Sequence, residues 1–301
     1  MLKKLCPLVL ALLLILSACG GQESAGAPAD DTGLSVVATT YPVYLLADAV
    51  IGEEAGVNLA LMIDQSISCL HDYTLSVENM RLLDGADAVL LSGAGLEDFL
   101  DDALAAAGDL VQVDCSQGVD LLPSQEDPGE SDPHYWMDPA RACQMVENLA
   151  QGLSQLLPES ANAFAANAQA AQDAILDAYA QEQEALADLS CRELITFHDG
   201  FSYFAEAFDL TILRAIEEES GSEASAQEVS QILQEVESHN LPAIFTEKNG
   251  SDSTAQVIQR ESGVAIYQLD LLMSGDKDTD GLAAYIAGMD ANVAVIQEAC
   301  A

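Results

Sequence analysis

The stretch "ESANAFAANAQAAQDAILDAYAQEQEALADL", Glu159 to Leu189, divides the chain into two halves and decides how they are joined. It is rich in alanine and has neither glycine nor proline, so it predicts one continuous helix. At 1.5 Å per residue this helix is about 45 Å long, enough to run past two domains. Its apolar positions keep no heptad repeat, which argues against a coiled coil. We therefore expect a stiff helix that joins two lobes and limits hinge motion between them.

On both sides of this helix, short apolar runs alternate with helical patterns. Strands are expected at residues 34–40, 57–63, 87–93 and 110–115, and again at 193–197, 210–215, 243–247 and 264–269. Helices are expected at residues 43–51, 74–86, 96–108, 202–208, 224–240, 251–262 and 281–298. Such alternation favours parallel sheets flanked by helices. We predict an α/β fold with two similar lobes, residues 34–157 and 190–301, joined by a linking helix at 158–189.

The first residues resemble an export signal. Two lysines precede an apolar run, Leu8 to Leu16, that is too short for a membrane span, and "LSAC" follows, ending at Cys19. This tetrapeptide resembles the lipobox of bacterial lipoproteins, in which the cysteine is lipidated and becomes the first mature residue. We expect a signal peptide at residues 1–18 and a flexible tether at 19–33. An ordinary secretory signal cleaved near the same small residues is the alternative.

The chain is strongly acidic. Fifty acidic residues face nine basic ones, giving a net charge of −41. Loss of residues 1–18 removes two lysines and no acid, which changes −41 to −43. Nucleic acid is excluded as a partner, because neutralising phosphates requires lysine and arginine. A negative surface raises the local concentration of cations, although for most of these carboxylates solubility is sufficient reason.

Three of the four histidines follow expected strands. His71, His134 and His198 occupy such positions, and ligands of open α/β sheets bind at the carboxyl ends of strands. His239 lies at the end of an amphipathic helix, where a surface role is expected. Three imidazoles favour Zn²⁺, whereas Mn²⁺ accepts more oxygen ligands. The pattern predicts a zinc site between the lobes.

A fourth ligand is expected among the acids near strand ends. Asp270 in "YQLDLL" is preferred, and Glu247 in "FTEKN" competes with it. Asp199 follows His198 directly, so its side chain should point away or support the site from outside. Trp136 in "SDPHYWMDPA" is the only tryptophan, and we expect it to pack beneath the site.

Catalysis is the less favoured function for such a site. A three-histidine zinc site with an open position can activate water. The chain contains no HExxH, no GxSxG and no phosphate-binding glycine loop. We therefore expect a binding protein and not an enzyme.

Four sequence blocks resemble those of the solute-binding lipoproteins of zinc and manganese ABC importers (the cluster A-I type). They are "VVATTYPVYLLADAVIGE", "HDYTLSVENMRLLDGADAVLLSGAGLEDFL", "DPHYWMDP" and "TFHDGFSYFAEAFDL", and the likeness covers essentially the whole mature chain. The resemblance implies two lobes joined by one rigid spanning helix. It also implies metal binding by His71, His134, His198 and Asp270. Leu70 stands where the usual pattern has proline, with Cys69 beside it.

The resemblance predicts a monomeric extracytoplasmic protein, lipid-anchored through Cys19 to a bacterial membrane. It would capture Zn²⁺ and deliver it to the permease of an ABC importer. The alternatives are Mn²⁺ as cargo, a surface adhesin, or a zinc-dependent hydrolase.

Five cysteines lie beyond the signal and Cys19: Cys69, Cys115, Cys143, Cys191 and Cys300. In an exported protein an odd number permits two disulfides and leaves one thiol. Cys191 with Cys300, and Cys69 with Cys115, are candidate pairs, but the connectivity does not follow from the sequence.

Overall fold

The computed structural model describes residues 33–53, 56–64, 70, 73–125, 129–216 and 224–301. Its contacts group Gly33–Ala301 into one compact unit. Three residues singled out in the sequence, Cys19, Cys69 and His71, lie outside the described residues.

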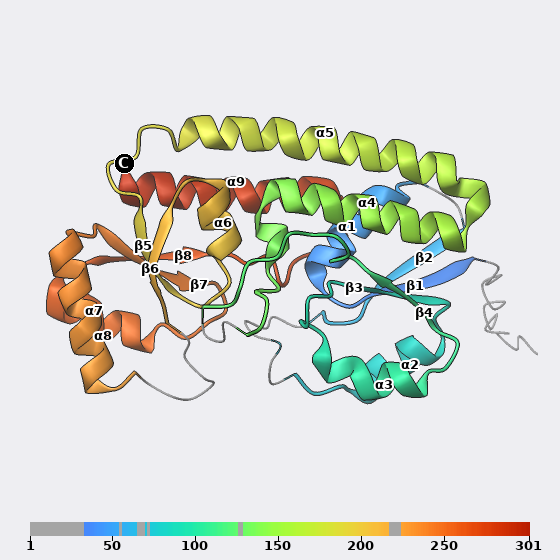
Figure 1. Ribbon diagram of the computed structural model, residues 1–301, viewed down its shortest axis with the longest axis horizontal. Helices are drawn as coiled ribbons and strands as arrows, with labels where there is room; N and C mark the ends of the chain where they lie inside the picture. Colours follow the sequence, from blue (N-terminus) through green and yellow to red (C-terminus); the bar gives the residue numbers. More distant parts are fainter. Residues whose placement is uncertain (1–32, 54–55, 65–69, 71–72, 126–128, 217–223) are drawn as a thin grey trace, which may run out of the picture. The chain divides into compact units, whose positions relative to one another are not determined.

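The first half of the chain forms a four-stranded parallel sheet in the order β2-β1-β3-β4 (Figure 1). Its strands are β1 (Leu34–Ala38), β2 (Val57–Leu61), β3 (Ala88–Leu91) and β4 (Val111–Asp114). Its helices are α1 (Tyr41–Ile51), α2 (Val77–Asp84) and α3 (Asp101–Ala106). Val36 on the central strand β1 pairs with Leu59 on one side and Ala88 on the other. Because β1 and β3 are buried, they read in the sequence as nearly continuous apolar runs.

The second half repeats this plan in the order β6-β5-β7-β8. Its strands are β5 (Glu193–Phe197), β6 (Thr211–Ala215), β7 (Ala243–Glu247) and β8 (Ala265–Leu269). Its helices are α6 (Ser202–Ala207), α7 (Ala226–His239), α8 (Ser253–Ser262) and α9 (Gly281–Cys300). The predicted α/β class and the predicted strands are confirmed.

Two helices of the first half begin later than predicted, each for a local reason. At α2, the Ser76 side chain accepts a hydrogen bond from the Asn79 backbone while the Asn79 side chain accepts one from the Ser76 backbone. This capping box fixes the first turn. Before α3, residues Gly93, Ala94 and Gly95 all have positive φ, so the chain turns there and forms only a 3₁₀ turn at Asp98–Leu100.

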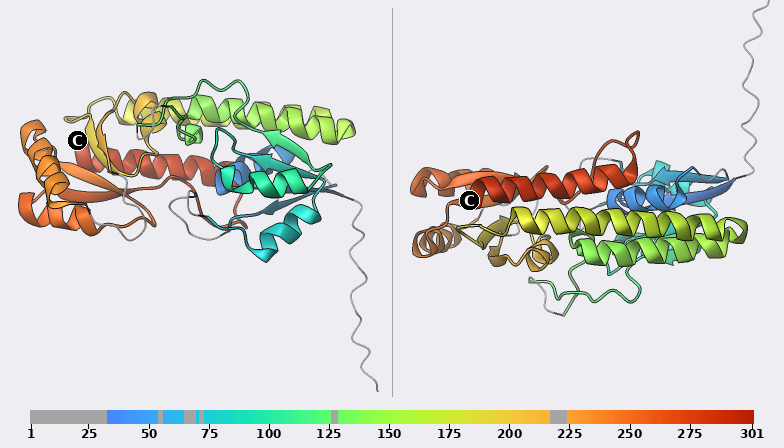
Figure 2. Two further views of the ribbon diagram at one scale, coloured as in Figure 1. Left: turned by 60° about the horizontal axis from the view of Figure 1, so that its bottom comes forward. Right: turned by 90° about the horizontal axis from the view of Figure 1, so that it is seen from above.

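The predicted linking helix is α5 (Ala161–Ala185), which follows α4 (Pro139–Leu156) after a 3₁₀ turn at Pro158–Ser160. Figures 1 and 2 show α5 running beside α4 and α9. The Asn167 amide of α5 donates to Val50 O (3.0 Å) in the first half, and the Tyr179 hydroxyl donates to Ala207 O (2.6 Å) in the second. The helix is therefore attached to both halves.

Helix α9 also connects the two halves, which the sequence did not predict. It packs on β8 of the second sheet and on α1 of the first. At its start, Gly281 N donates to Asp48 Oδ2 (2.9 Å), and a Cβ on Gly281 would lie 2.3 Å from Leu45 O. Only glycine permits this approach. Of the helices in the described part of the chain, none is long and apolar enough to cross a bilayer.

The largest apolar cluster draws residues from both halves. It includes Leu90 on β3, Phe164 on α5, Phe245 on β7 and Ile296 on α9. A smaller cluster around Ile232 and Ile258 lies where α7 and α8 cover the second sheet. This shared core holds the strand ends of both halves in place, and the candidate site is built on those strand ends.

Candidate metal centre

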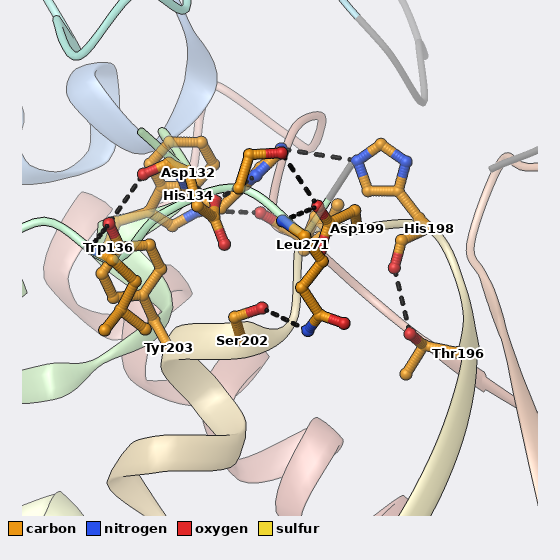
Figure 3. A network of polar contacts seen from close by, with 12 residues as sticks. Asp132, His134, Trp136, Thr196, His198, Asp199, Ser202, Tyr203 and Leu271 are labelled. Carbon is orange, nitrogen blue, oxygen red and sulfur yellow. Dashed lines mark hydrogen bonds and ion pairs between the residues drawn. The ribbon is translucent and has the colours of Figure 1, made fainter. Parts of the chain in front are cut away.

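Two histidines from different halves of the chain meet at the centre of the candidate site (Figure 3). His134 lies in the loop before α4, and His198 directly follows β5. Their Nε2 atoms are 3.4 Å apart, and their rings are nearly perpendicular, at 85°. Both side chains are buried, with His134 6% and His198 5% exposed.

The distance between these nitrogens fits a shared metal ion. Zinc binds imidazole nitrogen at about 2.0–2.1 Å with tetrahedral geometry, which places two nitrogen ligands about 3.4 Å apart. An N–H···N hydrogen bond between the rings accounts for the same distance when no ion is bound. The Nε2 atoms of the two rings face each other in this structure.

A carboxylate fixes the orientation of His134. Asp132 Oδ1 lies 2.8 Å from His134 Nδ1 and also accepts a hydrogen bond from the His134 backbone N–H (2.9 Å). Since an ionised carboxylate can only accept, Nδ1 carries the hydrogen and the lone pair of the neutral ring is on Nε2. This arrangement orients metal-binding histidines in many proteins. Asp132 was not among the residues predicted for the site, although the Asp-Pro-His spacing in the sequence is a signal for it.

Asp132 is held in turn by the second half of the chain. Its carbonyl oxygen accepts a hydrogen bond from the Tyr203 hydroxyl on α6 (2.6 Å), and the same hydroxyl accepts from Leu122 N (2.8 Å). Asp132 itself is only 1% exposed. The loop that carries His134 is therefore positioned by α6 as well as by its own turn.

Glu247 lies on the other side of the His198 ring. Its Oε2 atom is 3.9 Å from His198 Nδ1, whereas His198 Nε2 faces His134. A separation of 3.9 Å is too long for a direct hydrogen bond. The buried carboxylate at the end of β7 therefore lies beside the His198 ring, within ion-pair distance of its Nδ1 atom.

Asp270 follows β8 and is held by its surroundings. Its backbone N–H donates to Asn292 Oδ1 (2.8 Å), and its carbonyl accepts from Asn292 Nδ2 (2.7 Å). Its carboxylate accepts from Leu272 N through Oδ1 (2.8 Å) and pairs with Lys248 Nζ through Oδ2 (2.8 Å). Among the residues that the structure describes, no three histidine, cysteine or acidic side chains form a complete metal-binding group.

Trp136 connects the His134 loop to the turn after β8. Its ring is fully buried and meets the His134 ring edge-on, with centroids 5.4 Å apart. Its Nε1–H donates to Leu271 O (2.9 Å), and its carbonyl accepts from the Tyr285 hydroxyl of α9 (2.8 Å). Trp136 therefore links the segments that carry His134 and Asp270.

Asp199 is engaged with a loop of the first half. Its Oδ2 atom accepts from Gln125 N (2.9 Å) and from the Ser124 hydroxyl (3.2 Å). These contacts hold the segment before His134 against the end of β5.

Two parallel sheets joined by a long helix, with buried imidazoles contributed from both halves, define a two-lobed α/β binding protein. The chain belongs to the ZnuA family, described as zinc-uptake complex component A, periplasmic, and the family model matches residues 36–299. The family and fold predicted from the sequence are confirmed.

Relatives and solved structures agree with this assignment. The chain is 26% identical over 269 residues to the manganese-binding lipoprotein MntA of Halalkalibacterium halodurans, with 88% of each protein covered. It is 27% identical over 303 residues to the zinc-binding lipoprotein AdcA of Streptococcus pneumoniae, with 95% of this chain but only 58% of AdcA covered. A crystal structure of ZnuA superposes with a TM-score of 0.78 at 24% identity, covering 89% of this chain and 99% of that one.

Proposed function

We propose that this chain is the extracytoplasmic binding component of an ABC importer, which captures Zn²⁺ between His134 and His198 and delivers it to the permease. The observation that carries the proposal is the 3.4 Å separation of the two Nε2 atoms. It matches two nitrogen ligands of one tetrahedral zinc ion. The buried carboxylate of Asp132 favours the ring tautomer that such binding needs.

The proposed ligand set is completed by His71 and Asp270. In this structure the Asp270 carboxylate pairs with Lys248, whose ammonium group competes with an ion for Oδ2. Imidazole donors favour zinc over manganese, which prefers oxygen. Since relatives named for zinc and for manganese both resemble this chain, Mn²⁺ is the second candidate cargo.

The remaining features of the proposal concern the whole protein. We place it outside the cytoplasm as a monomer, attached to the membrane by a lipid on Cys19. It acts by binding and release, without catalysis. The family description as a periplasmic uptake component and the lipoprotein names of two relatives support this location.

Calorimetric titration of the chelator-stripped protein with ZnCl₂ tests the proposal. We expect one tight site, weakened at least about 100-fold in His134→Ala and in His198→Ala, because each variant loses one nitrogen ligand. His239→Ala is the matched control, since this partly exposed ring pairs with Glu193 at 3.0 Å on a different part of the surface. A stripped protein with no tight zinc site, or His134→Ala with unchanged affinity, contradicts the proposal.

Three further measurements separate the alternatives. Competition between Zn²⁺ and Mn²⁺ in the same titration identifies the preferred cargo. An adhesin keeps its partner after removal of the metal, and a zinc-dependent hydrolase turns over a panel of esters or peptides. Metal-independent partner binding or hydrolytic turnover, together with the absence of metal-dependent uptake in cells, contradicts the transport proposal.

A further inference from the structure

The end of the chain is attached to the start of the second sheet at two cysteines. Cys191 lies just before β5, and Cys300 is the last residue of α9. The Cys300 carbonyl accepts hydrogen bonds from Cys191 N (3.3 Å), from Ser190 N (2.8 Å) and from the Ser190 hydroxyl (2.9 Å). These contacts hold the backbones of the two cysteines side by side.

The two thiols are neighbours as well. Cys300 is 1% exposed and belongs to the main apolar cluster, against which the partly buried Cys191 packs. Burial, followed by the charge of the Cys191 thiol and a hydrogen bond with it, raises the pKa of Cys300 to about 11. The Cys191 thiol also donates to Glu193 O (3.5 Å), and the Cys143 thiol lies elsewhere, against Gln172 O on α5 (3.8 Å).

We propose that Cys191 and Cys300 form a disulfide when the chain is in an oxidising compartment. The proposal rests on the extracytoplasmic location given under the proposed function, because disulfides persist outside the cytoplasm. It selects one pair from the several that the sequence permits.

The oxidant in this proposal is the disulfide of a thiol oxidoreductase. The thiolate of Cys191, the more exposed of the two, attacks one sulfur of that disulfide and forms a mixed disulfide. The Cys300 sulfur then loses its proton, attacks the Cys191 sulfur and releases the oxidoreductase. The two cysteines lose two protons and two electrons, and the oxidoreductase is left with two thiols.

This crosslink would stabilise the helix that supports the metal centre. Helix α9 holds Trp136 O through Tyr285 and the Asp270 backbone through Asn292. Its last turn is also bound to α5, because the Gln297 amide donates to Ala185 O (3.2 Å). A disulfide at the end of α9 keeps the last turn of this helix attached to the start of β5. It also reduces the conformational entropy of the unfolded chain.

Peptide mapping of the exported protein tests the pairing directly. The protein is taken from its extracytoplasmic fraction, free thiols are blocked by alkylation in denaturant, and the chain is digested without reductant. We expect a crosslinked peptide that contains Cys191 and Cys300 and separates on reduction. Recovery of both cysteines as alkylated thiols overturns the proposal.

Thermal unfolding provides the second readout. Reduction with dithiothreitol should lower the melting temperature by roughly 5–10 °C, as expected for a long closed loop. Cys191→Ser and Cys300→Ser should each abolish this dependence on reductant, whereas Cys143→Ser should retain it. A wild-type protein with the same melting temperature in both redox states contradicts the proposal.

The two proposals fail independently. If both thiols are free while zinc binding is tight, only the disulfide is wrong. If the disulfide is present and the stripped protein binds no zinc, only the transport function is wrong.

Discussion

The carboxylate of Asp132 lies 2.8 Å from Nδ1 of His134 and thereby determines which nitrogen of the ring faces His198. Only Pro133 lies between these two residues in the sequence. The contact orients the His134 ring, so that Nδ1 is hydrogen-bonded to Asp132 and Nε2 is directed toward His198.

Substitution of Asp132 should weaken metal binding without removing a ligand. Asp132→Asn keeps an acceptor for Nδ1–H but loses the charge, and Asp132→Ala loses both. We expect zinc affinity to fall about 10-fold in the first variant and up to about 100-fold in the second. Competition with a chelating dye measures both values. Asp102→Asn, which removes the same charge from an exposed position of α3, is the control. Equal effects of Asp102→Asn and Asp132→Asn would show that only long-range charge matters.

Removal of Lys248 should strengthen metal binding. Its ammonium group pairs with Asp270 Oδ2 at 2.8 Å and competes with an ion for that oxygen. The Lys248 side chain is 56% exposed, so the pair contributes about 1 kcal/mol or less. We therefore expect Lys248→Met to increase zinc affinity about two- to fivefold, more at low salt than at high salt. Lys277→Met is the control, because Lys277 pairs with Asp64 at 3.7 Å. Unchanged or weaker binding in Lys248→Met argues against Asp270 as a ligand.

Loss of the Tyr285 hydroxyl should destabilise the fold. This buried group donates to Trp136 O at 2.8 Å, and Tyr285→Phe leaves that buried carbonyl without this donor. We expect a loss of about 1–2 kcal/mol in the free energy of unfolding, measured with urea at an unchanged m value. The emission of Trp136, the only tryptophan, should also shift. Tyr267→Phe should cost less, because that hydroxyl is 3.5 Å from Glu298 and exposed.

Stability should fall as the pH rises from about 4.5 to 7, in part because of Glu182. Burial, followed by the charge of Asp290 and a hydrogen bond with it, raises the pKa of Glu182 from 4.5 to about 7. The folded chain therefore holds this proton more tightly than the unfolded chain does, and ionisation above pH 4.5 favours unfolding. The upper limit is about 3 kcal/mol, and we expect about 1–2 kcal/mol because the partner Asp290 is exposed to solvent.

Glu182→Gln isolates this contribution. The variant should match the wild type near pH 4.5 and exceed its stability at pH 8, measured by urea unfolding at both values. Glu184→Gln, at an exposed position of the same helix, should leave the pH dependence unchanged. A wild type and a Glu182→Gln variant with parallel pH profiles would exclude a buried proton at this position.

Local patterns predicted most of the fold because they act within a few residues. The alternation of strands and helices and the glycine-free helix around Asn167 both follow from periodicity and backbone chemistry. The role of α9 did not follow, because its contact with α1 depends on Gly281 meeting Leu45 and Asp48, far away in the sequence.

For the candidate metal centre, the sequence by itself predicted the donors: few histidines, three of them after expected strands, and an acid after the last strand. Only the tertiary structure decided how those predicted donors that it describes, His134, His198 and Asp270, are arranged. It placed the Nε2 atoms of His134 and His198 3.4 Å apart, oriented one ring with Asp132, and paired Asp270 with Lys248. The physical reason is that periodicity specifies which residues end a strand, whereas a distance between two side chains depends on how both halves pack on their shared core.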